Sequence, residues 1–157
     1  MLEFEHIVQV NDRNNDRLPD ISREQLWEGL VLRARNPEKF NHALDCQSYP
    51  ISDTEFMRTI EAGHIFFEEK VKLYPQDRIC THTVGDDEIN AASTTTIEEP
   101  EDGFLFVRFS YRRELSVEDD RVDVAEHLKS AYVQVDRDAI ALIRLLAECE
   151  ILDEKIN

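Results

Sequence analysis

Apolar and polar residues alternate at the start of the chain and again through most of residues 46–113, with the period of half-buried strands. Clusters of Asp, Gly, Pro and Ser interrupt the alternating runs and are typical of turns. The pattern predicts seven strands, near residues 4–10, 46–51, 55–61, 64–74, 78–84, 90–98 and 104–113. Because short turns join the last six strands, we expect them to form an antiparallel meander.

Two helical segments are expected between the first strand and the second. Ser22 and Gln25 have the spacing of a capping box, which predicts a helix over residues 23–35. Pro37 ends this helix, because a proline disfavours helical geometry at the residue before it. Pro37 also suits the first position of a second short helix, which would carry Phe40 and Leu44.

The end of the chain has the spacing of three and four residues that marks an amphipathic helix. This spacing predicts a helix over residues 118–152, about 50 Å long, with a kink allowed near residues 134–138. The apolar positions are Val122, Ala125, Leu128, Tyr132, Val135, Ala139, Leu142, Ile143 and Leu146. Such a stripe needs an apolar partner, and the concave face of the sheet is the surface that can supply it. The chain therefore predicts a single α+β domain over residues 1–157, with a curved sheet around the last helix.

Several segments of the chain resemble a known family. They read FEHIVQVND at 4–12, SREQLWEGLVLRA at 22–34, TIEEP at 96–100 and LFVRFSY at 105–111. The chain resembles the AtaL-like branch of the SRPBCC superfamily, which includes START domains, the birch-pollen allergen and polyketide cyclases. The resemblance covers nearly the whole chain and implies the helix-grip fold, a seven-stranded antiparallel sheet wrapped around a long C-terminal helix. No catalytic motif is defined for this branch, so the resemblance implies a fold and a style of substrate rather than a reaction.

The net charge and the cysteine content limit the partners and the cellular compartment that we expect for this protein. The chain has 18 Lys and Arg against 34 Asp and Glu, which gives a net charge of -16. Such a surface repels phosphate backbones and anionic lipids, so neither nucleic acid nor a membrane is an expected partner. Cys46, Cys80 and Cys149 are too widely spaced for a disulfide scaffold or a zinc ribbon. The start of the chain is acidic and no apolar run could span a membrane, so we expect a cytoplasmic protein with reduced thiols.

Two charged residues, Arg58 and Glu69, fall in the apolar phase of neighbouring strands. A turn at Gly63 joins these strands, so Arg58 lies opposite Phe67 or Glu69, depending on the length of the loop. We infer an inward pair, because a buried charge without a partner is costly. The pair could orient a polar group of a ligand, and Glu69 could serve as a general base. The alternatives are a structural salt bridge at a sheet edge and a register that leaves both residues exposed.

Other inward-facing residues complete the predicted cavity wall. The candidate ligand contacts are Trp27, Arg58, Phe67, Glu69, Thr95, Phe109, Tyr111 and Tyr132. In the last strand, Phe109 and Tyr111 share the phase expected to face the helix, and the Tyr111 hydroxyl could point into the cavity. Each candidate has a structural alternative, since Trp27 and Tyr132 lie on apolar helix faces and Thr95 is a residue type that favours strands.

The sequence does not indicate a metal or nucleotide site. No His-x-His or His-Glu-x-x-His motif occurs, and Cys80 with His82 provides too few ligands for zinc, in the outward phase of their strand. No glycine-rich phosphate loop and no Gly-x-Ser-x-Gly elbow occurs either, so we expect no cofactor. His6 falls in the inward phase of the first strand, where a lone histidine is usually a hydrogen-bonded core residue.

Three functions fit these features. The first is a binding protein that holds a small apolar or aromatic molecule between the sheet and the C-terminal helix. The second, which the resemblance implies, is an enzyme or accessory factor of polyketide cyclase or dehydratase type in secondary metabolism, with Arg58, Glu69 and Tyr111 as catalytic candidates. The third is a protein-interaction adaptor, which would have a filled interior and a large exposed apolar patch. The sequence leaves a homo-oligomer open.

Overall fold

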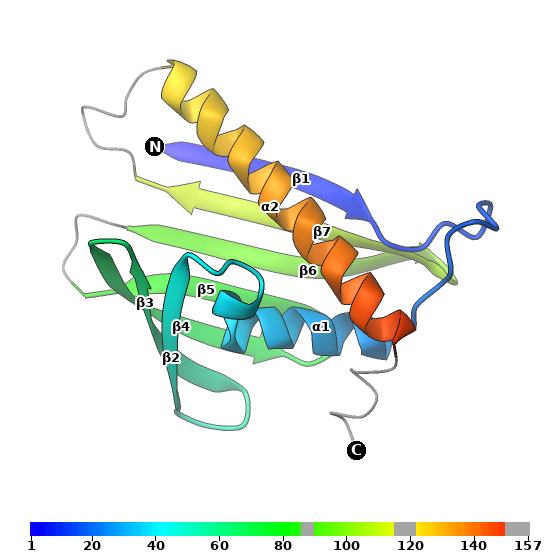
Figure 1. Cartoon of the computed structure of the whole chain (residues 1–157), viewed down its shortest axis with the longest axis horizontal. Coiled ribbons are helices and arrows are strands. Elements are labelled where there is room, and N and C mark those ends of the chain that lie inside the picture. The colour runs from blue at the N-terminus through cyan, green and yellow to red at the C-terminus, as the bar shows by residue number, and fades with distance from the viewer. Residues whose placement is uncertain (86–89, 115–121, 150–157) are drawn as a thin grey trace.

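Figure 1 shows the computed structural model of the chain, which describes residues 1–85, 90–114 and 122–149. Its strands are β1 (Leu2–Gln9), β2 (Leu44–Pro50), β3 (Glu55–Ala62), β4 (Ile65–Tyr74), β5 (Arg78–Val84), β6 (Ala91–Glu101) and β7 (Phe104–Arg113). They form a seven-stranded sheet in the order β1-β7-β6-β5-β4-β3-β2, and every neighbouring pair is antiparallel. The predicted antiparallel meander is therefore confirmed, with β1 added beside β7.

The first helix, α1 (Arg23–Arg35), begins and ends where the sequence predicts. Ser22 accepts a hydrogen bond from the Gln25 backbone, and the Gln25 side chain accepts one from the Ser22 backbone, which completes the capping box. The predicted second helix is wrong in its extent. Only a 3₁₀ turn, η1 (Pro37–Lys39), forms, because the backbone turns at Asn41 and Leu44 already starts β2.

The long helix, α2 (Val122–Glu148), is uninterrupted through residues 134–138, where the sequence allowed a kink. At 1.5 Å per residue its 27 residues span about 40 Å. The predicted ends, near residues 118 and 152, lie outside the described residues. Its buried face is also rotated from the predicted stripe, since Val135 is 44% exposed whereas Asp136 is fully buried.

The two helices cover the concave side of the sheet. In Figure 1, α2 runs diagonally across β1 and β7, and α1 lies near the C-terminal half of α2. The helices approach closely at Gly29, where a Cβ atom would overlap the side chain of Ile143. Among the described residues, no helix combines the length and the apolar character needed to cross a lipid bilayer.

The described core lies where α1, α2 and the sheet meet. Its fully buried large side chains include Leu26 on α1, Ile143 on α2, Phe56 on β3 and Phe109 on β7. Leu105, Val107 and Phe109 face the helices as their strand phase predicts. This core fills one side of the space under α2 and leaves the other side for the cavity described next.

Candidate functional site

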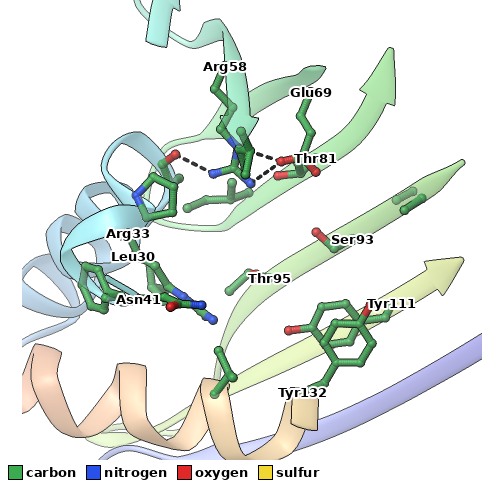
Figure 2. Close-up of a pocket in the computed structure, with 18 of the residues that line it drawn as sticks. Leu30, Arg33, Asn41, Arg58, Glu69, Thr81, Ser93, Thr95, Tyr111 and Tyr132 are labelled. Carbon is green, nitrogen blue, oxygen red and sulfur yellow. Dashed lines mark hydrogen bonds and ion pairs between the residues drawn. The ribbon is translucent and has the colours of Figure 1, made fainter. Parts of the chain in front are cut away.

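A cavity of about 280 Å³ lies between the concave face of the sheet and the helices. Residues of α1, of the segment after it, of strands β2 to β7 and of α2 line it. Figure 2 shows its polar side chains, which gather in groups. Arg58 and Glu69 form one end, Tyr111 and Tyr132 form another, and Thr95 and Ser93 lie between them on β6.

Arg58 and Glu69 lie directly opposite each other on β3 and β4, so the predicted pairing is confirmed and the Phe67 register is excluded. The Arg58 Nε atom donates to Glu69 Oε1 at 2.9 Å, and its Nη2 atom lies 2.8 Å from the same oxygen. Each side chain is 13% exposed. The alternative register that leaves both residues in water is therefore wrong.

A third bond of Arg58 ties the pair to α1. The Arg58 Nη1 atom donates to the carbonyl oxygen of Ala34 at 2.6 Å, one residue before the end of the helix. A cation suits this place because the last carbonyl groups of a helix carry partial negative charge. Each of the three guanidinium nitrogens of Arg58 thus contacts Glu69 or Ala34, and none of the described residues donates a hydrogen bond to Glu69 Oε2.

Behind the cavity wall lies a second polar cluster, centred on Asp136 of α2, whose side chain is fully buried. Its Oδ2 atom accepts hydrogen bonds from the Tyr111 hydroxyl at 2.5 Å and from His6 Nε2 at 2.7 Å. Its Oδ1 atom accepts one from Arg33 Nη2 at 2.9 Å. Because a carboxylate can only accept, the His6 proton is on Nε2. The cluster joins α1, α2, β1 and β7 through charge-assisted bonds.

Tyr111 belongs to both the cavity wall and the Asp136 cluster. Its ring stacks on Tyr132 with the ring centroids 4.0 Å apart, and both residues line the cavity. Burial, followed by the nearby negative charge of Asp136, raises the pKa of Tyr111 well above its usual range. The hydroxyl therefore stays protonated, and it is bonded to Asp136 rather than free to reach into the cavity.

Some of the predicted ligand contacts line the cavity and others do not. Arg58, Glu69, Thr95, Tyr111 and Tyr132 line the cavity.

The predicted contacts Trp27, Phe67 and Phe109 do not line the cavity. Trp27 and Phe109 are buried in the main core, where Phe109 lies 5.1 Å from the His6 ring. Phe67 is half-buried opposite Ile60. Strand phase and helix face show which residues point inward, but they do not show whether packed side chains or empty space faces those residues.

The sequence analysis also missed several polar residues of this region. Arg33, Asn41 and Thr81 line the cavity, and Asp136 fixes its wall from behind. A signal for Asp136 was present, because it lies one turn after Tyr132 and one turn before Ile140 on the buried face of α2. Thr81 likewise shares the phase of Ile79 on β5.

The described residues hold no group of three or more His, Cys, Asp or Glu side chains placed to bind a metal ion. Cys80 is half-buried and His82 is exposed, on the side of β5 opposite the buried Ile79 and Thr81, as their strand phase predicts. The described lining of the cavity carries carboxylate, guanidinium, hydroxyl and amide groups.

These features define the class: a helix-grip domain with a cavity between a curved antiparallel sheet and a long C-terminal helix. The chain belongs to the AtaL family, whose model carries the description "Acetylaranotin biosynthesis cluster protein L" and matches residues 8–150. A search of curated proteins gives no significant match.

Solved structures with this fold include several aromatase/cyclases. The di-domain aromatase/cyclase StfQ of the steffimycin biosynthetic pathway aligns with a TM-score of 0.71 at 10% identity, over 95% of this chain and 51% of its own. The Zhui aromatase/cyclase from a Streptomyces species aligns with a TM-score of 0.63 at 10% identity, over 96% and 95%. The chain spans about half the length of the di-domain proteins and nearly all of the single-domain one.

A plant enzyme has the same fold. A point mutant of norcoclaurine synthase from Thalictrum flavum, in complex with a transition-state analogue, aligns with a TM-score of 0.64 at 11% identity, over 92% of this chain and 94% of its own. At such low identity these similarities show the shared fold and leave the chemistry of this chain to its own residues.

Proposed function

We propose that this protein binds a small apolar or aromatic molecule in the cavity between the sheet and α2. The observation that carries the proposal is a cavity of about 280 Å³ with apolar walls and polar groups at separate ends. Its volume is near the lower end of the ~300–1,000 Å³ range of ligand pockets, which favours a molecule of one or two rings. The stacked rings of Tyr111 and Tyr132 offer an aromatic face to such a ligand.

The polar groups of the cavity suit a ligand that carries a few hydrogen-bonding groups. Glu69 Oε2 can accept a bond from a ligand hydroxyl, while Arg58 holds the other oxygen in place. Thr81 and Thr95 add hydroxyl groups on β5 and β6. A ligand that matched none of these groups would leave them desolvated without partners, so they also select against wholly apolar molecules.

A cavity-filling variant tests this proposal. Thr95→Trp places a large ring in the cavity, and Thr94→Trp places the same ring on the other side of β6. We expect 2-naphthol to bind the wild-type protein and Thr94→Trp equally, and Thr95→Trp at least tenfold more weakly, by isothermal titration calorimetry. Circular dichroism and urea unfolding control for the fold. Equal binding to the two variants, or no binding to the wild type, would contradict the proposal.

The second candidate is an enzyme or accessory factor of cyclase or dehydratase type. It is favoured by the open Oε2 atom of Glu69 beside a fixed Arg58, and by the biosynthesis cluster in the description of the family. Native mass spectrometry of the protein purified from its own source would identify a bound molecule. If that molecule is also converted, we expect Glu69→Gln to abolish turnover and to leave affinity nearly intact. Unchanged turnover would remove Glu69 as the base.

The adaptor alternative is less well supported, because an adaptor needs no internal cavity and this structure has one. The exposed large apolar side chains of the described residues are also spread over several elements, from Ile7 on β1 to Leu145 on α2.

A further inference from the structure

We infer that the ligand of the cavity is an organic acid, whose carboxylate binds Arg33. This inference rests on the proposed function and adds the chemical class of the ligand. Arg33 is on α1, its side chain is 21% exposed, and it lines the cavity. The sequence analysis did not select this residue.

The hydrogen-bonding capacity of Arg33 is only partly used by the protein. A guanidinium group carries five N–H donors. With the described residues it forms a single hydrogen bond, from Nη2 to Asp136 Oδ1 at 2.9 Å. That bond fixes the orientation of the guanidinium group, and the Phe109 ring lies 5.8 Å from its Cζ atom. Arg33 is therefore held in place with donors to spare, which is the arrangement that binds a carboxylate with good geometry.

The other charged groups of the lining do not compete for this role. All three nitrogens of Arg58 contact Glu69 or the Ala34 carbonyl, and the Glu69 carboxylate compensates its charge, whereas Arg33 bonds the protein through one nitrogen. Arg112 is 65% exposed at the rim, where it lies 3.7 Å from Glu3. Asp136 bonds one nitrogen of Arg33 and shares its other oxygen between His6 and Tyr111, so it leaves further N–H donors of Arg33 unused.

The charge of the lining differs from that of the chain as a whole. Its charged residues are Arg33, Arg58, Arg112 and Glu69, a net charge of +2 from three Arg and one Glu. The chain as a whole carries -16. Arg112 is exposed, and Arg33 and Arg58 each have one carboxylate partner, so the lining attracts an anion through the unused N–H donors of Arg33 rather than through an excess of charge.

Asn41 supplies a second polar group on the same side of the cavity, and Figure 2 shows it and Arg33 in the same part of the view. The Asn41 Oδ1 atom accepts a bond from the Ala43 backbone at 3.1 Å, which fixes the side chain and leaves its amide N–H groups as donors. Apolar lining residues such as Leu30 and Phe40 suit the rest of the acid.

The test compares two ligands of one shape, 2-naphthoate and its neutral isostere 2-naphthamide, by isothermal titration calorimetry. We expect the wild-type protein to bind the naphthoate about 10–100-fold more tightly, the range for charge-assisted hydrogen bonds. Arg33→Gln should reduce this preference to less than about threefold. Arg35→Gln is the matched control, because Arg35 lies on the same helix over the Phe56 ring, outside the cavity lining, and should keep the preference.

A second variant keeps the inference falsifiable if Arg33→Gln fails to fold. Asn41→Asp retains the oxygen that accepts from Ala43 and adds a negative charge at an exposed position. We expect it to weaken binding of 2-naphthoate at least tenfold and that of 2-naphthamide by less than about threefold. Equal affinity of the wild-type protein for the two ligands would overturn the organic-acid inference and leave the proposed function standing. If the wild-type protein binds none of 2-naphthoate, 2-naphthamide and 2-naphthol, that result would instead overturn the proposed function.

Discussion

Two carboxylates of this protein have contrasting surroundings. Asp136 is fully buried and accepts hydrogen bonds from three side chains that come from α1, β1 and β7. Glu69 is 13% exposed at the cavity wall and uses one oxygen for Arg58, while the described residues leave its other oxygen without a donor. A saturated, buried carboxylate stabilises the fold, whereas a half-saturated one at a cavity can still bind a partner.

This contrast separates structural from functional roles better than burial alone. Tyr111 lines the cavity, but its hydroxyl donates to Asp136 and so links β7 to α2. Arg33 bonds the same carboxylate with one nitrogen and keeps further donors for the cavity. The roles of these residues therefore depend on how many hydrogen bonds each has left to make.

The largest expected effect is that of Asp136→Asn. It removes the charge that three donors share and puts an amide N–H group among them, so we expect a loss of about 3–5 kcal/mol in the free energy of unfolding. Urea unfolding measures it. Asp138→Asn is the control on the same helix, at an exposed position bonded to Gln134, and should stay within about 0.5 kcal/mol of wild type. A similar small change in Asp136→Asn would mean that the buried cluster is not structural.

A smaller effect is expected for Tyr111→Phe, which removes one donor to Asp136 and should cost about 1–3 kcal/mol. The raised pKa of Tyr111 adds a pH dependence. An unfolded tyrosine ionises near pH 10, so above about pH 10 the unfolded chain releases a proton that the folded protein retains. Stability should therefore fall as pH rises above 10, and less steeply in Tyr111→Phe. The measurement is the urea midpoint of the wild-type protein and of Tyr111→Phe between pH 8 and pH 10.5. If the two midpoints change in parallel with pH, Tyr111 does not cause this fall.

The smallest effect on stability is expected for Glu69→Gln. The amide oxygen can still accept a hydrogen bond from Arg58, and Arg58 keeps its bond to the Ala34 carbonyl. Because Arg58 also faces a cavity that water can enter, we expect a loss of about 1–2 kcal/mol in the free energy of unfolding. Urea unfolding beside Asp136→Asn tests the order of the two variants. A larger loss in Glu69→Gln than in Asp136→Asn would reverse the comparison between the two carboxylates.

The sequence by itself determined the elements of the sheet and the inward phase of Arg58 and Glu69, and it left Phe67 and Glu69 as the two residues that could lie opposite Arg58. Alternation has a period of two residues, so it identifies the inward face of a strand without any knowledge of distant contacts. The loop from β3 to β4 has two residues, with Gly63 at a φ of 64°, and such a short hairpin loop fixes the register of the strands that it joins. The capping box at Ser22 and the break at Pro37 are equally local, which is why α1 begins and ends as predicted.

Only the tertiary structure decided which inward residues face empty space and which polar residue is buried. Asp136 is separated by 130, 103 and 25 positions from His6, Arg33 and Tyr111, so no local pattern relates these residues. Periodicity places position 136 on the buried face of α2, but a charged residue is stable there only when donors from other elements surround it. Likewise, Trp27 and Phe109 point inward as the sequence predicts, but the packing of α1 and α2 on the sheet encloses them in the core and leaves the cavity elsewhere.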